Sequence, residues 1–260
     1  MREKGALYTD WKETERAKAK AVAAWYRARN EAAYAQSPDA LIDLAVADAR
    51  EAMQSQGYSN KSYPKNRKVY DATQLFPSEE QLFTYMGSML NYWCAESSQE
   101  HMCNIYSIHL NDGTTEYIAG SVYTGKHDNV ILPYLLYSGA EAGLMELSEE
   151  YAGVDIQEGM LHSHPYCKGH ENYQFSWGDA AVALLSGRIW LTAPNGTVYA
   201  LERGRAVEAL GASLFRDTAF GKTNKGTIDA IRASENYLVP NVRGYDVTQD
   251  YQQVDDRRWR

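Results

Sequence analysis

The chain has 260 residues, of which 44% are hydrophobic, and its formal net charge is −8. This apolar content can bury one large core, so we expect a globular protein. The negative charge disfavours a protein that binds nucleic acid through a broad cationic surface, because phosphate contacts dominate that affinity. No apolar stretch approaches the roughly 20 residues that a membrane span requires, so no span is expected.

Two features of the sequence bear on its compartment. The first residues are charged and lead into a polar segment, residues 8–16, where a secretory signal would have an apolar core. We therefore expect a cytoplasmic protein, a protein delivered by a secretion system that needs no cleavable signal, or part of a longer chain. The cysteines Cys94, Cys103 and Cys167 are too few for a disulfide scaffold. A bridge between Cys94 and Cys103 would suit an oxidising compartment, but we favour buried free thiols.

Residues 1–58 are predicted to form a helical N-terminal extension. Residues 12–29 are rich in amino acids of high helix propensity. A second helix is expected to begin with Ser37 as its N-cap and Pro38 at its first position, and to stop near Gly57. Residues 59–75 turn polar and basic, which predicts a linker or surface loop.

The main domain is expected over residues 76–210. Ser78 and Gln81 form a capping box that begins a core helix. Two strands, 104–110 and 114–123, follow around the hairpin signal Asn111-Asp112-Gly113. Further elements are expected at 141–151 (helix), 156–164 (strand), 176–185 (helix), 189–192 (strand) and 197–201 (strand). This order predicts a mixed α/β fold with a central mixed sheet flanked by helices, followed by a partly irregular C-terminal extension over 211–260.

The segment that carries chemistry begins with His162-Ser-His164. Side chains alternate along a strand, so both imidazoles point to the same face and form a ready pair of zinc ligands. Asp179 lies in the first turn of the next expected helix and could supply a third ligand. A set of three protein ligands leaves a fourth position open for water, as in catalytic zinc sites. Zinc lowers the pKa of such a water to about 7.

The same residues permit a structural interpretation. Ser176-x-x-Asp179 also fits a capping box at the start of a helix, and histidines in strands are often structural. It is the combination of the histidine pair with the aspartate that favours a metal site.

A hydrolytic zinc site also needs a carboxylate that is no ligand and that transfers protons. We assign this role to Glu116, because regular alternation would place it on an apolar face with Ile118 and Val122, where an ionised group needs a partner. The alternative is that Glu116 lies at the exposed beginning of its strand, beside the turn.

Together these residues resemble the JAMM motif of the JAB/MPN metalloproteases. The resemblance rests on His162-Ser-His-Pro165, on Ser176-x-x-Asp179 and on an upstream glutamate at the start of a strand after a core helix. It implies that His162, His164 and Asp179 bind Zn²⁺, that Glu116 is the general acid/base, and that Ser176 helps to stabilise the oxyanion. It also implies the cytidine-deaminase-like architecture of that superfamily.

The segment from Phe175 through the pattern at 189–199 looks particularly like a bacterial JAB-related branch whose members occur among polymorphic toxins. The resemblance covers residues 76–204. It departs from the better-known members in the loop between His164 and Ser176, which has eleven residues and is longer than theirs. Cys167 and His170 lie in this loop, which either shapes the substrate cleft or is an ordinary surface insertion. Either residue as a fourth protein ligand would close the site, and we expect neither to bind zinc.

Two main functions compete at this point. The first is a zinc peptidase or isopeptidase acting on a protein or peptide, for which ubiquitin-like conjugates are one candidate substrate and an adaptor or immunity protein is a candidate partner. The second is a JAB/MPN-like protein-binding module that has lost activity, against which the retention of all motif positions argues. A zinc deaminase is a third interpretation, but its Pro-Cys-x-x-Cys motif is missing.

Overall fold

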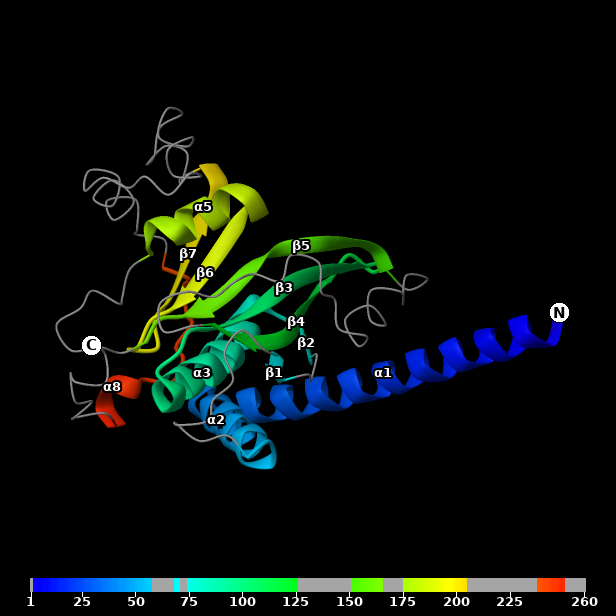
Figure 1. Cartoon of the computed structure of the whole chain (residues 1–260), viewed down its shortest axis with the longest axis horizontal. Helices are drawn as coiled ribbons and strands as arrows, with labels where there is room; N and C mark the ends of the chain where they lie inside the picture. Colours follow the sequence, from blue (N-terminus) through cyan, green and yellow to red (C-terminus); the bar gives the residue numbers. More distant parts are fainter. Residues whose placement is uncertain are drawn as a thin grey trace.

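The computed structural model describes residues 2–57, 68–70, 74–125, 151–165, 175–204 and 238–250. Within these residues, one mixed sheet of seven strands lies between helices (Figure 1). The predicted α/β class with a central mixed sheet is therefore confirmed. None of the helices in these ranges combines the length and the apolar character that crossing a membrane requires.

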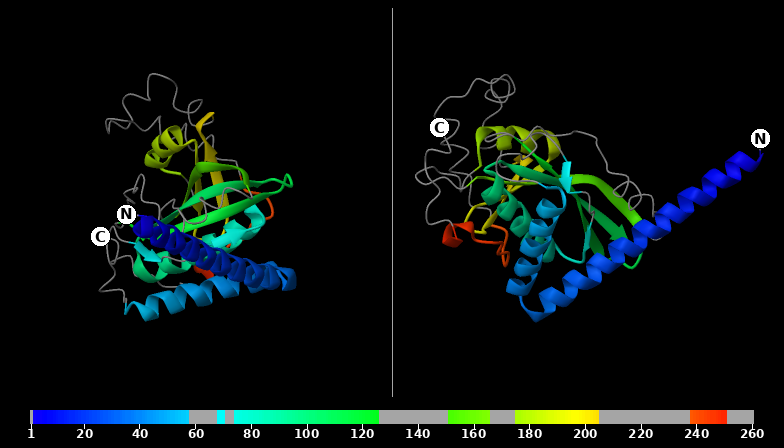
Figure 2. Two further views of the ribbon diagram at one scale, coloured as in Figure 1. Left: turned by 90° about the vertical axis from the view of Figure 1, so that its right-hand side faces the viewer. Right: turned by 60° about the horizontal axis from the view of Figure 1, so that its bottom comes forward.

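The N-terminal region forms two helices, α1 (Arg2–Gln36) and α2 (Pro38–Ser55). The predicted start of α2 is confirmed, because the Ser37 hydroxyl oxygen accepts a hydrogen bond from the amide of Ala40 at 3.0 Å. One face of α2 is buried in the same core as the central helix of the domain. The first turns of α1 extend away from the rest of the protein (Figure 2). The extension is thus continuous with the main fold along α2 and the end of α1.

The predicted linker at 59–75 was wrong for two short segments of chain. Strands β1 (Lys68–Tyr70) and β2 (Gln74–Phe76) both pair antiparallel with β4 (Thr115–Thr124). Val69 and Phe76 are buried there. Three-residue strands are too short to show alternation, and the polar residues before them dominate the composition of the segment.

The central helix α3 (Glu79–Ser97) begins at the predicted N-cap, where the Ser78 hydroxyl oxygen accepts from the amide of Gln81 at 3.3 Å. Strand β3 (His101–Leu110) follows it and starts earlier than predicted. The predicted hairpin between β3 and β4 is confirmed. Gly113 in its turn has a φ of +86°, a left-handed conformation that favours glycine.

The second half of the sheet contains β5 (Tyr151–Ser163), β6 (Arg188–Thr192) and β7 (Val198–Glu202), with helix α5 (Trp177–Ser186) between β5 and β6. The strand order is β1-β4-β3-β5-β6-β7, with β2 on β4, and β5 and β6 form a parallel pair among otherwise antiparallel neighbours. A parallel pair needs a crossover, and α5 supplies it. The helix predicted over 141–151 lies outside the described residues except at Tyr151, which belongs to β5.

The two faces of the sheet bury different sets of side chains. Leu161 and Trp190 point to the face that α3 covers, together with Cys103 and Ala200. Met160 and Leu191, their neighbours in sequence, point to the opposite face with Met102 and with Ala183 of α5. Figure 1 shows α3 and α5 on these opposite sides. The alternation along β5 therefore assigns His162 to the α5 face.

The described part of the C-terminal extension packs against the domain. Leu238 forms an isolated bridge with Tyr199. The amide of Tyr245 donates to the Ser88 hydroxyl of α3 at 2.9 Å, and Asn91 Nδ2 donates to the Tyr245 carbonyl at 3.0 Å. A short helix, α8 (Val247–Asp250), follows.

Polar contacts fix the second half of α1 to the body. Asn30 Nδ2 donates to Gln74 Oε1 at 2.8 Å, and both side chains are buried. Arg27 pairs with Glu116, whose side chain is only 8% exposed. Burial raises the pKa of Glu116, and the Arg27 guanidinium opposes that effect. The ion pair therefore offsets part of the cost of placing a carboxylate here.

We expect Arg27→Ala to lower the free energy of unfolding by about 1–2 kcal/mol, because it leaves the Glu116 carboxylate buried without its cationic partner. Urea unfolding monitored by circular dichroism measures the change. Glu51→Ala removes an exposed charge from the neighbouring helix α2 and should change stability by less than about 0.5 kcal/mol. Equal unfolding midpoints for the two variants would contradict the role given to the pair.

Candidate metal centre

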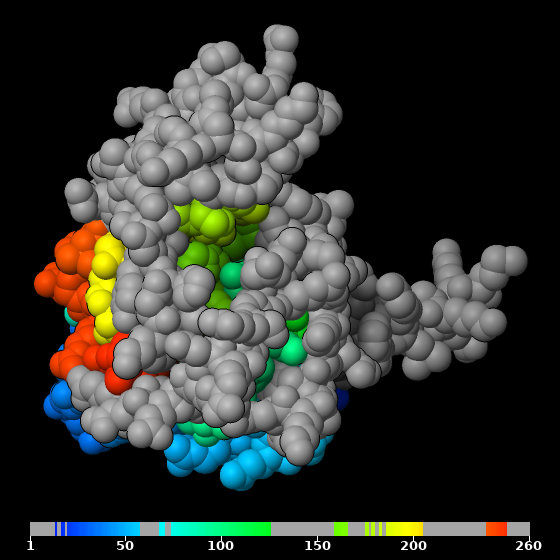
Figure 3. Space-filling model, turned by 60° about the vertical axis from the view of Figure 1, so that its left-hand side comes forward, coloured from blue at the N-terminus to red at the C-terminus, as the bar shows by residue number. Residues whose placement is uncertain are grey.

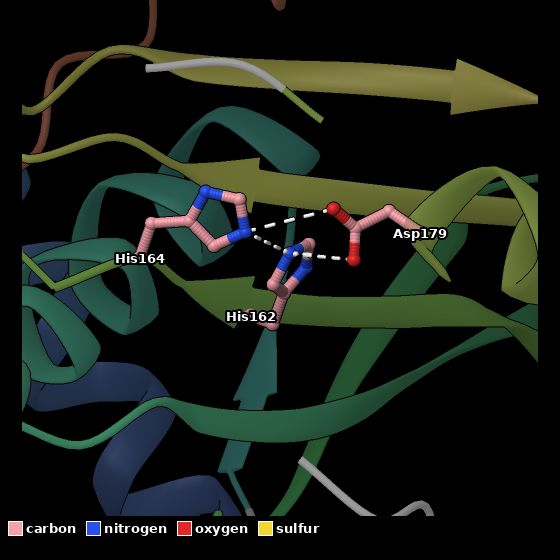
Figure 4. Close-up of side chains that lie close together, drawn as sticks. All are labelled: His162, His164 and Asp179. Atoms are coloured by element: carbon pink, nitrogen blue, oxygen red, sulfur yellow. Dashed lines mark hydrogen bonds and ion pairs between the residues drawn. The ribbon is translucent and has the colours of Figure 1, made fainter. Parts of the chain in front are cut away.

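Three side chains from two elements converge on the α5 face of the sheet (Figure 4). His162 is the penultimate residue of β5, His164 follows that strand, and Asp179 lies in the first turn of α5. His162 Nε2 is 3.1 Å from His164 Nε2 and 3.3 Å from Asp179 Oδ1. His164 Nε2 is 3.5 Å from Asp179 Oδ2. The predicted ligand set is thus assembled in space.

These donor atoms are close enough to one another to share one metal ion. Metal–nitrogen and metal–oxygen bonds of about 2.0–2.1 Å give a tetrahedron whose edges are ~3.3–3.4 Å long. His162 Nε2 lies 3.1 Å from His164 Nε2 and 3.3 Å from Asp179 Oδ1, close to that edge, whereas the 3.5 Å to His164 Nε2 is measured from the other carboxylate oxygen, Oδ2. One ligand atom from each residue lies within 4.8 Å of the other two, so one metal ion could contact all three residues after the side chains adjust, and two imidazoles with a carboxylate suit zinc.

The ring of His162 is held in the tautomer that a metal requires. Its Nδ1 lies 2.7 Å from the carbonyl oxygen of Trp190 in β6. A carbonyl only accepts, so Nδ1 carries the hydrogen and the lone pair of the neutral ring is on Nε2, facing His164 and Asp179. Phe175 packs against the same ring at 6.3 Å between centroids. A second hydrogen bond and an apolar neighbour are the usual surroundings of a metal-binding histidine.

The position of Asp179 is compatible with both roles that the sequence left open, the helix cap and the metal ligand. Its Oδ2 accepts a hydrogen bond from the amide of Ser176, and its own amide donates to the Ser176 hydroxyl at 3.2 Å, which completes a capping box. The same carboxylate presents Oδ1 to His162 and Oδ2 to His164. The cap orients the carboxylate, because one bond to the amide of Ser176 fixes the plane of the group that faces the histidines.

The centre is a largely buried polar cluster. The side chains of His162, His164 and Asp179 are 6%, 10% and 14% exposed. Burial acts to raise the pKa of Asp179, but the adjacent His162 and His164 overcome it and hold that pKa well below its ordinary value. Asp179 is therefore an anion in the folded state, as a ligand must be. In Figure 3, yellow-green atoms of β5 and α5 reach the surface beside blue-green atoms of the α3–β3 region.

The structure does not bring Glu116 to this centre. Glu116 pairs across the sheet with Ile108, whereas His162 pairs with Met102 on the same strand, β3. Six residues separate Ile108 from Met102, which corresponds to ~20 Å along a strand. The carboxylate contacts Arg27 of α1 instead. The assignment of Glu116 as the proton carrier was wrong, because the need for a partner on an apolar face is met by an arginine.

A second reason for the error lies in the shape of β4. The register between β3 and β4 shifts between Cys103 and Ile105, where three residues of β4 replace two. Regular alternation from Glu116 to Val122 is lost at this bulge, and Val122 joins the core under α3 while Ile118 joins a different cluster. The apolar face that the sequence suggested for Glu116 is therefore two separate surfaces.

The register points instead to Glu100, which the sequence interpretation missed. Met102 opposes His162 in an antiparallel ladder, so Glu100, two residues earlier, comes opposite His164. If the extended path of β3 continues one residue before His101, Glu100 shares a face with Met102 and both histidines. Glu100 is partly buried and lies outside the ligand cluster. A signal existed: Glu100 is the first carboxylate after the core helix and immediately precedes a strand.

The other residues singled out in the sequence lie in three different places. Ser176 is the exposed N-cap of α5, one turn from Asp179. Cys167 and His170 lie outside the described residues, so their predicted place in the substrate cleft stays a prediction. Cys94 and Cys103 are free and buried, as favoured from the sequence, and burial raises the pKa of the Cys94 thiol.

We compared the chain with models of known protein families, with curated proteins and with solved structures, and none of them matches it. The geometry of the centre and the motif in the sequence are therefore what indicate a function.

We expect the purified chain to bind about one zinc ion, and His164→Ala to weaken that affinity by at least 100-fold while leaving the circular dichroism spectrum unchanged, because one of three ligands is lost. Competition with a chromogenic zinc chelator measures the affinity. His109→Ala is the matched control, since His109 is an exposed histidine at the far end of β3. Equal zinc affinity in both variants would contradict the site.

Proposed function

We propose that this protein is a zinc-dependent hydrolase that cleaves an amide bond, as a peptidase or isopeptidase of the JAB/MPN type. One observation carries the proposal: His162, His164 and Asp179 converge with their ligand atoms within 4.8 Å of one another, and His162 is fixed by the Trp190 carbonyl so that its Nε2 faces the other two donors. Three ligands leave a position for a water molecule, which distinguishes a catalytic site from a closed structural one.

A zinc ion in this set would supply a nucleophilic water at neutral pH and would polarise the carbonyl of the substrate. The protein must then accept a proton from the water and return one to the leaving amine. Glu100 is suited to this role, since continuing the β3–β5 ladder past Met102 and His162 would bring it opposite His164, and it is not one of the clustered donors. A carboxylate beside a metal that is not itself a ligand can accept a proton from the bound water and return it.

Ser176 is suited to stabilising the oxyanion. Its oxygen already accepts a hydrogen bond from the amide of Asp179, so its hydroxyl hydrogen is directed elsewhere and can be donated. Its place at the N-terminus of α5 adds the positive end of the helix dipole, which favours a developing negative charge.

The main alternative is a JAB/MPN-like binding module without activity. Two features favour the enzyme: the Trp190 carbonyl fixes His162 in its ligand tautomer, and continuing the β3–β5 ladder would bring a non-ligand carboxylate, Glu100, opposite His164. A scaffold that binds proteins through its surface needs neither.

We extend the proposal to the class of substrate and to the cellular location that the motif suggests. The substrate would be a protein or peptide, with ubiquitin-like conjugates as one class. The toxin-like branch of the resemblance suggests a bacterial effector, acting in the cytoplasm or delivered by a signal-independent secretion system, with an adaptor or immunity protein as partner. A panel of fluorescence-quenched peptides and of isopeptide-linked ubiquitin substrates would identify the cleaved bond.

We expect Glu100→Gln to keep zinc and to lower kcat by about 10²-fold or more, because the amide has nearly the same size but cannot accept the proton. Glu116→Gln makes the same chemical change on the neighbouring strand, far from the centre, and should leave kcat within twofold. The two variants are compared on the best substrate from the panel. A loss of activity in Glu116→Gln with none in Glu100→Gln would restore the original assignment and contradict the present one.

A further inference from the structure

Ser163 separates the two histidine ligands in sequence and lies on the other face of β5. Its side chain is fully buried. Its hydroxyl oxygen accepts a hydrogen bond from the amide of His101 at 3.2 Å and lies 3.5 Å from the His101 carbonyl. It also contacts the Cys94 thiol of α3. Ser163 therefore joins the end of β5 to the first residue of β3 under the α3 core.

The main chain on both sides of Glu100 is held by further hydrogen bonds. Before it, the amide of Gln99 donates to the Ser97 hydroxyl at 3.2 Å, after a helix end at which Ser98 has a φ of +57°. The Glu100 carbonyl itself accepts from the amide of Gly125 at 2.7 Å. After it, the amide of His101 is bound by Ser163. Glu100 thus sits in a short segment whose path is fixed at each neighbouring residue.

The ring of His101 strengthens this arrangement. Its Nδ1 lies 2.9 Å from the Gln99 carbonyl, which makes Nδ1 the donor, and the ring packs against Trp93 at 5.9 Å between centroids. Burial lowers the pKa of His101 to about 3, so the ring stays neutral at physiological pH. The residue after Glu100 is therefore part of the rigid core under α3.

Ser163 cannot reach a metal ion or a substrate at the centre, because the sheet separates its side chain from His162 and His164. Any effect on the reaction has to pass through the backbone of β3. The residue best placed to transmit it is Glu100, which directly precedes His101 and which the continued ladder would bring opposite His164.

We infer that Ser163 is a positioning residue that sets the main chain of β3 against β5 and so holds the Glu100 carboxylate beside the metal ligands. The inference rests on the proposed function. A misplacement of about 1 Å can cost a reaction up to ~10²-fold. Ser163→Ala is therefore expected to lower kcat about 10-fold, with KM and zinc affinity within twofold of the wild type.

The test is a double-mutant cycle on the zinc-loaded full chain. Ser163→Ala, Glu100→Gln and the double variant are compared for kcat, for zinc affinity and for exchange of the His101 amide hydrogen by nuclear magnetic resonance. If Ser163 acts through Glu100, the double variant should match Glu100→Gln in kcat, because the carboxylate to be positioned is already absent. The His101 amide should exchange faster in Ser163→Ala, by at least 10-fold.

Two further variants keep the test independent of folding. Ser163→Thr keeps the hydroxyl and should restore kcat to within threefold of the wild type, while Ser163→Cys removes it with little change in size and replaces the alanine variant if that one unfolds. Ser88→Ala is the matched control: Ser88 is also a buried serine that binds main-chain groups, the Thr84 carbonyl and the amide of Tyr245, away from the centre. Its loss should leave kcat unchanged.

The outcomes separate this inference from the proposed function. If kcat falls by the product of the two single effects in the double variant, or if Ser163→Ala weakens zinc binding as much as it lowers kcat, Ser163 does not act through Glu100 and the inference is overturned. The proposed function would stand in both cases. If the wild type cleaves none of the substrates in the panel, the proposed function fails and the inference fails with it.

Discussion

The antiparallel ladder between β3 and β5 is the constraint on which the candidate centre depends. It fixes Met102 opposite His162, and from that single match it follows which residues of β3 share a face with the histidines. The parallel neighbour β6 then supplies the Trp190 carbonyl to His162, and the crossover helix between β5 and β6 brings Asp179 to the same edge. A slip of one residue in the ladder would turn Glu100 to the α3 side and put His101 opposite His164. Which side chains meet at this site therefore depends on strand register as much as on residue identity.

The two faces of β5 carry different kinds of side chain: one packs into the core, and the other carries the candidate metal ligands. Toward α3, Leu161 and Ser163 join a large core that includes Trp93 and Trp190. Toward α5, the histidines lie in a smaller polar cluster at the carboxyl end of the strand. Strands β5 and β6 are in close contact at Gly159. A Cβ there would lie 2.4 Å from the Arg188 carbonyl oxygen, so only glycine lets the two strands approach at this point. The candidate metal ligands are thus held on or beside rigid elements, as precise sites require.

Local pattern was enough to predict most of the ligand set. The His-x-His alternation and the Ser176-x-x-Asp179 spacing depend on neighbours in the sequence, and strand and helix periods fix what those neighbours do. Which carboxylate comes near these residues depends on pairing between strands, which no local pattern encodes. From the sequence, we assign Glu116 to the centre because a buried carboxylate needs a partner. That premise holds, but the partner is Arg27, which belongs to a helix some ninety residues earlier in the chain. Sequence patterns do not predict the bulge in β4 or the short strands β1 and β2 for the same reason, because these features exist only through contacts with other strands.

The central claim is that two imidazoles and one carboxylate bind a single zinc ion and leave one position open. X-ray absorption at the zinc edge of the zinc-loaded chain measures this most directly. The account predicts two histidine nitrogens among four light-atom ligands, at about 2.0–2.1 Å, and no sulfur. It also predicts that His162→Ala loses the signal of one imidazole or the bound zinc itself. A sulfur ligand at about 2.3 Å, as Cys167 would supply, or a spectrum that is unchanged in His162→Ala, would contradict the account.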